Sequence, residues 1–259
     1  TPLVGDYVEF KADNENEGYV LKILERKNQL VRPPVANVDC AIVVTACIEP
    51  DFSSNLLDRQ LVMLSENEIV PILYFSKADL MDETTKERML PVFDYYSKYY
   101  RTVVSEKNMA DEELVSALLE EAGNVLVVMG QTGAGKSTLL NRLDPKLKLE
   151  TGEISKALSR GRHTTRKVSL MDVKGHLVAD TPGFSSFELR EIEKERLSSL
   201  FEDFNEYSPQ CRFRGCLHLN EPDCAVKAAV LEGKILESRY ENYKLFQKMI
   251  QEQKPRYKR

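Results

Sequence analysis

Hydrophobic and polar positions alternate along the first 35 residues, with Gly5 and Gly18 between the alternating stretches. A period of two is typical of half-buried strands, so this part predicts short antiparallel strands of a small barrel or sheet. Thirty-five residues are too few to close a barrel, and the chain does not begin with methionine, so we expect further strands upstream. The pair Pro33 and Pro34 predicts a linker at the end of this part.

From Val38 onward, short apolar runs rich in β-branched residues alternate with longer stretches of helical spacing. The apolar runs lie at 41–48, 69–75, 101–104 and 125–129, and the helical stretches at 53–66, 82–98 and 111–122. This alternation predicts a parallel sheet covered by helices on both faces. A further helix is expected near the end of the chain, over about 234–253.

The composition narrows the class of protein. The 259 residues are 42% hydrophobic and 30% charged, as in soluble globular proteins. Runs such as AIVV from Ala41 are far too short to cross a bilayer, and no secretory signal is visible. The net charge of −5 does not by itself indicate a nucleic-acid partner. We therefore expect a cytoplasmic protein with no membrane partner.

The segment GQTGAGKST follows the apolar run NVLVVM and precedes the helix-forming STLLNRL. Its Gly-x4-Gly-Lys-Ser pattern in this context predicts a phosphate loop, whose glycines and helix start turn backbone N–H groups toward phosphates. Lys136 is expected to reach the β- and γ-phosphates, and the Ser137 hydroxyl to ligate Mg²⁺. The predicted nucleotide-binding residues of the phosphate loop are Gly130, Gln131, Thr132, Gly133, Ala134, Gly135, Lys136, Ser137 and Thr138.

Two later segments can complete a magnesium site. DTPG follows the apolar run HLVAD, so Asp180 is expected to hold Mg²⁺ through water and the Gly183 N–H to contact the γ-phosphate. GRHTTRK lies between the phosphate loop and DTPG. In it, Thr165 is our first choice and Thr164 our second for a magnesium ligand once a γ-phosphate is bound. The alternative for that stretch is a basic surface loop.

No Asn-Lys-x-Asp motif follows the phosphate loop, although most G proteins recognise their base there. SKAD, at the end of the apolar run IVPILYF, lies upstream instead. The Asp79 carboxylate can accept two hydrogen bonds from guanine, one from its ring N–H and one from its exocyclic amine. Adenine has no such pair of donors there. The stem of Lys77 can lie against the base. VVSEK ends the next run and is expected to lie near the guanine carbonyl. The predicted base-recognition residues are Ser76, Lys77, Ala78, Asp79, Ser105, Glu106 and Lys107.

Three of the five cysteines lie between 211 and 224, which favours a metal over disulfides. Cys211, Cys216, His218 and Cys224 offer three thiolates and one imidazole, the donor set of a closed tetrahedral zinc site. Such an ion would stabilise a region whose core is small. The spacing is not that of a DNA-reading finger, so no DNA partner is expected. Cys40 and Cys47 flank an apolar run and are predicted to be buried packing residues.

The motifs together form a complete G-protein set with the base-recognition half first. This order, with DTPGF leading into the cysteine-rich end and with VGDYVEF and CRFRGCLHLNEPDCAVKAA, resembles the circularly permuted GTPases of the RsgA family. The resemblance covers essentially the whole chain. It implies an α/β fold: a truncated N-terminal OB-fold barrel (1–35), a circularly permuted P-loop G domain (36–198) and a C-terminal zinc-binding domain (199–259). Ser76 departs from the usual Asn, so guanine specificity rests on Asp79.

The residue after the DTPG glycine is Phe184, where Ras-like enzymes have a glutamine that orients the attacking water. Phe184 can neither donate nor accept a hydrogen bond. His163 is the best local candidate to orient water, and the resemblance also implicates it, whereas a loop histidine that contacts solvent or RNA is the alternative. With Lys136 and Thr165 it forms the expected catalytic set, and we predict slow hydrolysis that rises when a partner orders 160–167.

The leading interpretation is an enzyme that hydrolyses GTP to GDP and phosphate with Mg²⁺. The resemblance implies late assembly of the small ribosomal subunit, with this subunit and its rRNA as partners, and we expect a monomer. A second interpretation is an RNA-binding assembly module whose nucleotide is a static structural ligand, for which Phe184 argues. A third, a P-loop ATPase or kinase, is opposed by Asp79.

Overall fold

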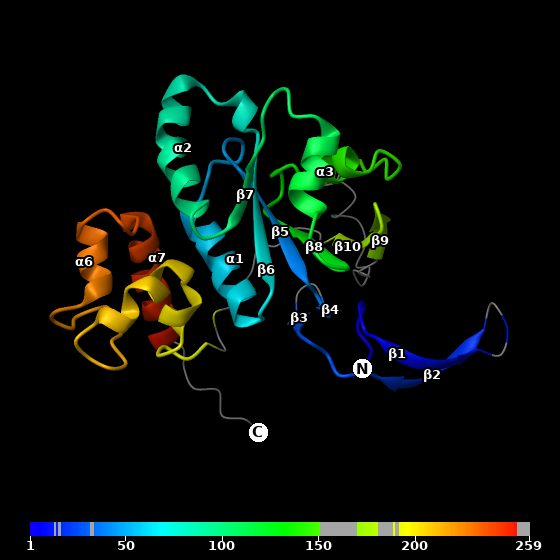
Figure 1. Cartoon of the computed structure of the whole chain (residues 1–259), viewed down its shortest axis with the longest axis horizontal. Coiled ribbons are helices and arrows are strands. Elements are labelled where there is room, and N and C mark those ends of the chain that lie inside the picture. The colour runs from blue at the N-terminus through cyan, green and yellow to red at the C-terminus, as the bar shows by residue number, and fades with distance from the viewer. Residues whose placement is uncertain are drawn as a thin grey trace.

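The computed structural model describes residues 1–12, 14, 17–31, 34–150, 170–180, 189 and 192–252. Among these residues, six strands form a central sheet in the order β7-β6-β5-β8-β10-β9 (Figure 1). The strands are β5 (Cys40–Ala46), β6 (Val70–Ser76), β7 (Arg101–Val104), β8 (Val125–Met129), β9 (Leu170–Val173) and β10 (His176–Asp180). Neighbouring strands are parallel except the edge strand β9, which runs antiparallel to β10.

Helices cover both faces of this sheet, as predicted. They are α1 (Ser54–Glu66), α2 (Glu83–Tyr96), α3 (Asp111–Leu119) and α4 (Lys136–Leu143). Every residue of β5 is buried. Its alternate side chains enter two cores, because Ala41 and Val43 pack with α1 and α2, whereas Ile42 and Val44 pack with α3 and α4.

The element boundaries agree closely with the sequence pattern. The predicted strands at 101–104 and 125–129 coincide with β7 and β8. Ser53 caps α1, because its side chain accepts a hydrogen bond from the Leu56 N–H at 3.2 Å. Helix α3 ends three residues before the predicted 122, because the backbone of Glu120 turns to an extended conformation.

The N-terminal part consists of two antiparallel hairpins. One pairs β1 (Val8–Ala12) with β2 (Gly18–Ile23), and the other pairs β3 (Gln29–Val31) with β4 (Pro34–Ala36). The predicted linker is wrong at Pro34, which begins β4, since the first residue of an edge strand can be proline without losing a ladder hydrogen bond. All of β1 is exposed, and the boundary after residue 35 falls inside β4, so the barrel and this division stay predictions.

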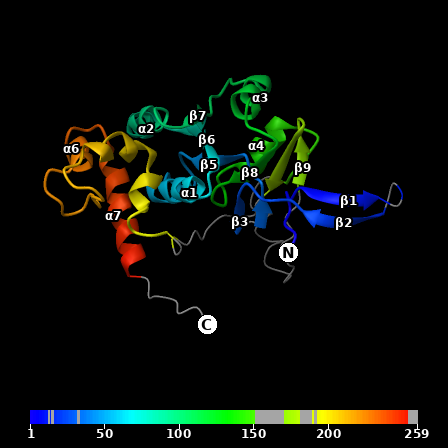
Figure 2. The same ribbon diagram turned by 60° about the horizontal axis from the view of Figure 1, so that its bottom comes forward.

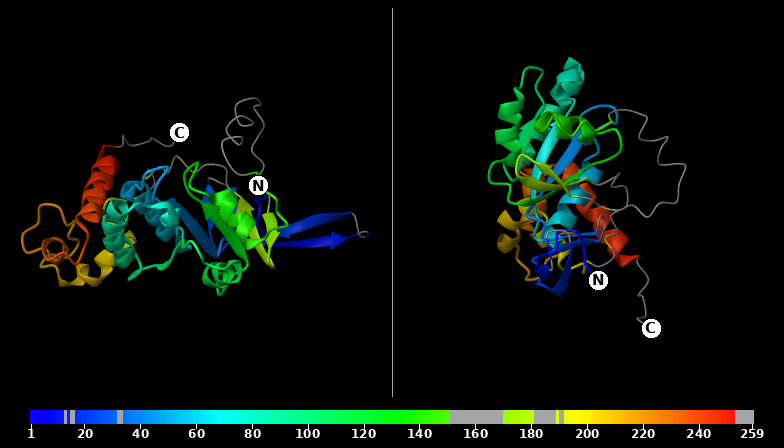
Figure 3. Two further views of the ribbon diagram at one scale, coloured as in Figure 1. Left: turned by 90° about the horizontal axis from the view of Figure 1, so that it is seen from above. Right: turned by 90° about the vertical axis from the view of Figure 1, so that its right-hand side faces the viewer.

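The C-terminal part has a separate core. Short 3₁₀ turns η2 (Leu197–Leu200), η3 (Glu202–Glu206) and η4 (Ser208–Gln210) precede α6 (Ala225–Leu231) and α7 (Glu237–Gln251). Phe201, Phe204, Tyr243 and Phe246 fill this core, and Val62 of α1 joins them. In Figures 2 and 3 this part lies at the opposite end of the molecule from the β1–β2 hairpin.

A buried charge network joins the C-terminal part to the sheet domain. Arg239 of α7 is 1% exposed and pairs with Asp58 of α1 at 2.7 Å and with Asp203 of η3. The hydroxyls of Tyr96 and Tyr95 in α2 donate to Asp58 at 2.6 Å and to Asp203 at 2.5 Å. Although burial opposes its charge, the two carboxylates hold the pKa of Arg239 well above its ordinary value. The side chain of Arg239 and its partners therefore hold helices α1, α2 and α7 together.

We expect Arg239→Ala to lower the free energy of unfolding by about 3–5 kcal/mol, because it leaves two buried carboxylates without their cation. Urea unfolding followed by circular dichroism measures this difference. Lys248→Ala is the control, since this lysine lies on the same helix with 70% of its side chain exposed. A loss in Arg239→Ala no larger than in the control would contradict the role assigned to the network.

Candidate functional site

The phosphate loop lies between the carboxyl end of β8 and the start of α4. Gly130 has a φ of +148°, and a Cβ there would lie 2.1 Å from the carbonyl oxygen of Val44 in β5, so only glycine fits. Gly135, with a φ of +93°, is the N-cap of α4. The Lys136 Nζ donates to the carbonyls of Gly130 at 2.8 Å and Gln131 at 3.0 Å. The strand, loop and helix expected of a phosphate loop are therefore present.

The other residues of the phosphate loop differ in exposure. Ser137, in the first turn of α4, is half-buried. Thr132, Gly133 and Thr138 are exposed, whereas Ala134 is fully buried. The exposed side of the loop thus combines backbone N–H groups, a helix N-terminus and a lysine, which is an arrangement suited to an anion.

The predicted base-recognition residues lie on the next loops of the same sheet edge. Ser76 ends β6, Lys77 has a left-handed backbone, and η1 (Ala78–Leu80) follows. The Ser105 hydroxyl accepts a hydrogen bond from the Ala78 N–H at 2.9 Å and donates to the Asp79 carboxylate at 3.4 Å. Ser105 is therefore buried behind Asp79 and orients it, while Asp79 itself is exposed.

A pocket of about 550 Å³ opens beside Asp79 and Ser105. Glu106 and Lys107, both exposed, line it together with Phe93 of α2. The phosphate loop contributes no residue to this lining.

The structure brings the two loops together although they are far apart in the chain. The Ser76 hydroxyl donates to the carbonyl oxygen of Ala134 at 2.6 Å, across 58 positions of sequence. Asp180 is the last residue of β10 and pairs with Val128 of β8, which places it at the same edge. His163, Thr164, Thr165, Gly183 and Phe184 lie outside the described residues.

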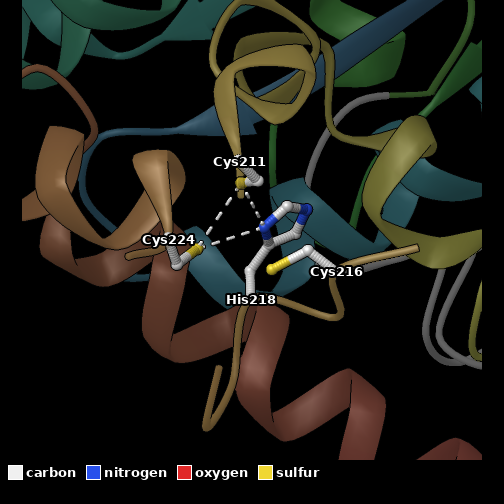
Figure 4. Close-up of side chains that lie close together, drawn as sticks. All are labelled: Cys211, Cys216, His218 and Cys224. Atoms are coloured by element: carbon white, nitrogen blue, oxygen red, sulfur yellow. Dashed lines mark hydrogen bonds between the residues drawn. The ribbon is translucent and has the colours of Figure 1, made fainter. Parts of the chain in front are cut away.

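The four predicted metal ligands meet in the C-terminal part, as Figure 4 shows. Their donor atoms all lie within 4.8 Å of one another. The His218 Nδ1 lies 3.3 Å from the Cys224 sulfur and 3.6 Å from the Cys211 sulfur, and Cys216 completes the set. Three sulfurs and one imidazole nitrogen at these distances fit a single tetrahedral metal ion. We call this cluster the metal centre.

Residues that the sequence did not predict hold the metal centre in place. The Ser208 hydroxyl lies 3.2 Å from the His218 Nε2, which leaves Nδ1 for the metal. The hydroxyls of Tyr240 and Tyr243 in α7 donate to the carbonyls of His218 at 2.7 Å and Leu217 at 2.6 Å. No motif marks Ser208, but the two tyrosines are three residues apart in a predicted helix, a spacing that places them on one face.

Burial sets the ionisation of these groups when no cation is bound. Burial lowers the pKa of His218, so its imidazole is neutral near pH 7 and can coordinate a metal. Burial also raises the pKa of Cys216 to about 12 and that of Cys224 above its ordinary value. Thiolates so placed need a positive charge beside them, which a metal ion supplies. Cys40 and Cys47 are buried elsewhere, as predicted.

The family model of the RsgA GTPases matches residues 23–190. The chain belongs to the RsgA GTPase family. It is 55% identical to the small ribosomal subunit biogenesis GTPase RsgA of Limosilactobacillus reuteri, over the whole chain and 88% of that protein. The RsgA of Bacillus cytotoxicus is 52% identical over 99% of this chain and 88% of its own length.

Two solved structures of similar proteins support the same assignment. YloQ, a circularly permuted GTPase, superposes with a TM-score of 0.81 at 41% identity over 99% of this chain and 83% of its own. YjeQ from Thermotoga maritima gives 0.83 at 36% identity over 98% of this chain and 86% of its own. The circular permutation predicted from the order of the motifs is therefore confirmed, and the chain is a GTP hydrolase of the RsgA family.

We expect the purified protein to carry about one metal ion per chain, and a chelator to increase amide hydrogen exchange over 197–252, because the ion holds this small core together. Cys216→Ala should lose the metal. Cys40→Ala, which removes a buried cysteine outside the metal centre, should keep it. Metal content by mass spectrometry checks both variants. Full metal content in Cys216→Ala, or unchanged exchange after chelation, would contradict the assignment.

Proposed function

We propose that this GTP hydrolase converts GTP to GDP and phosphate with Mg²⁺ as its metal, and that it acts in late assembly of the small ribosomal subunit, where it binds rRNA. The observation that carries the nucleotide site is the Ser76–Ala134 hydrogen bond, which sets the Asp79 loop directly beside the phosphate loop. The names of the relatives in L. reuteri and B. cytotoxicus support the ribosomal role.

In this proposal each loop has a defined task at the nucleotide. Asp79 accepts the hydrogen bonds of guanine, while Ser105 orients it and Lys77, Ala78, Glu106 and Lys107 surround the base. The phosphate loop from Gly130 to Thr138 binds the phosphates, and the Lys136 ammonium group neutralises their negative charge. Mg²⁺ is held by Ser137 and Asp180, with Thr165, or Thr164 in its place, added when GTP is bound. Gly183 contacts the γ-phosphate.

His163 is proposed to orient the attacking water, because the position of the usual glutamine is Phe184. A ribosomal partner that orders 160–167 would then raise the rate. Lys136 and Thr165 stabilise the charge that develops on the phosphates.

The metal is proposed to be zinc with a structural role, since all four ligand positions of a tetrahedral ion are taken by protein. The OB-fold barrel (1–35), the G domain (36–198) and the zinc-binding domain (199–259) remain the proposed division. We propose a cytoplasmic monomer without a DNA or membrane partner. Within the described residues, no helix has the length and apolar character needed to span a membrane.

A second candidate is an RNA-binding assembly module with a nucleotide that is not hydrolysed. Phe184 favours it, because it removes the side chain that usually orients water. The family's GTPase activity and the two threonines beside His163 favour turnover.

The test is GTP hydrolysis by the purified protein with Mg²⁺, with and without small ribosomal subunits. We expect slow turnover that the subunits stimulate, abolished in Lys136→Ala and unchanged in Lys146→Ala, an exposed lysine just after α4. Tight GTP binding without turnover in either condition would favour the static module.

The same assay tests whether His163 orients the attacking water. His163→Ala should lower the stimulated rate about 100-fold while GTP affinity is kept, since it removes water orientation alone. His176→Ala is the matched control, because this histidine contacts the Gly123 carbonyl at the start of β10, the opposite end of the strand from Asp180. Unchanged basal and stimulated rates in His163→Ala would show the catalytic assignment to be wrong.

A further inference from the structure

Ser76 occupies the position of the asparagine that heads the usual base-recognition motif, yet its side chain is buried and bonds to the phosphate loop. Ser76 is 4% exposed. Its hydroxyl donates to the Ala134 carbonyl at 2.6 Å, whereas the Thr45 carbonyl is more distant at 3.4 Å. A hydroxyl has one proton to donate, so the shorter bond to the phosphate loop is the one formed.

The bonded peptide joins Ala134 to Gly135, the residue that precedes the lysine of the phosphate loop. A peptide unit is planar and trans, so its N–H points opposite to its C=O. When Ser76 holds the Ala134 carbonyl, the N–H of Gly135 is turned away from β6. Gly135 is the N-cap of α4. The first N–H groups of a helix have no acceptor within it and are free to bind a phosphate.

The residues of this hydrogen bond are buried and held by further backbone contacts. Ala134 is fully buried, and its N–H donates to the Gln131 carbonyl at 3.2 Å. Ser76 is the last residue of β6 and pairs with Ala46 of β5. A Cβ built on Gly135 would lie 3.8 Å from the Ser76 side chain, so the turn passes directly over the serine.

We propose that Ser76 is a positioning residue for the phosphates: its hydroxyl fixes the Ala134–Gly135 peptide of the phosphate loop, and it takes no part in recognising the base. Base recognition belongs to the exposed Asp79, which Ser105 orients. This inference rests on the proposed nucleotide site. It assigns to a buried serine the bond that links the base-recognition loop to the phosphate loop.

The proposal predicts which nucleotides are affected by the loss of the hydroxyl. Ser76→Ala should weaken GDP binding about five- to tenfold, the effect of one buried hydrogen bond. GMP lacks the β-phosphate and should bind within about twofold of wild type. Inosine diphosphate lacks the exocyclic amine, and the ratio of its affinity to that of GDP should stay the same. Ser76→Thr keeps a hydroxyl on a β-branched side chain suited to a strand and should restore GDP binding.

Competition against a fluorescent GDP analogue gives the three affinities for each variant, and thermal unfolding without nucleotide reports on the fold. Equal losses for GMP and GDP, or a changed ratio of GDP to inosine diphosphate, would overturn the proposal, as would unchanged GDP affinity in Ser76→Ala. If Ser76→Ala does not fold, a GMP-to-GDP affinity ratio in Ser76→Thr that differs from wild type would also overturn it. Failure of the wild-type protein to bind GDP would instead reject the proposed nucleotide site.

Discussion

The parallel pairing of β5 with β6 on one side and β8 on the other is the constraint on which the site depends. Ala46 of β5 lies opposite Ser76, and Val43 opposite Met129, so three strands end at one edge. The close approach of Gly130 to the Val44 carbonyl fixes the phosphate loop at that edge. Because parallel strands meet there whatever their order in the chain, the two halves of a G-protein site can be exchanged in sequence without moving the site.

Strand β5, through the helix α1 that follows it, connects the nucleotide edge of the sheet to the metal centre. The chain leaves β5 near the phosphate loop and enters α1, whose Asp58 holds Arg239 of α7 in a buried pair. The tyrosines of α7 in turn hold the carbonyls of the metal centre. Side-chain contacts therefore run from the sheet domain to the metal centre through a buried pair, and leaving one of its charges unpaired would cost several kcal/mol.

Much of this could be predicted from the sequence, because strand periodicity, glycine spacing and metal-ligand spacing are local signals. The order of the strands in the sheet was not predicted, because it depends on pairing between segments far apart in the chain. The Asp58–Arg239 pair joins residues 181 positions apart, and Ser208 has no motif, so both depend on tertiary packing. The place of Ser76 in a motif predicts a role at the base, whereas its hydrogen bond to the Ala134 carbonyl, from which we infer a role at the phosphates, depends on tertiary packing.

One measurement tests directly whether Asp79 and the phosphate loop form a single guanine site: the affinities for GDP and xanthosine diphosphate of wild type and Asp79→Asn. Xanthine has a carbonyl in place of the exocyclic amine of guanine, which is the group that donates a hydrogen bond to the Asp79 carboxylate. We predict that wild type prefers GDP and that Asp79→Asn changes the ratio of the two affinities by about 100-fold or more in favour of xanthosine diphosphate. Adding Lys136→Ala to Asp79→Asn should abolish binding of both nucleotides. An unchanged preference for GDP in Asp79→Asn would contradict the account.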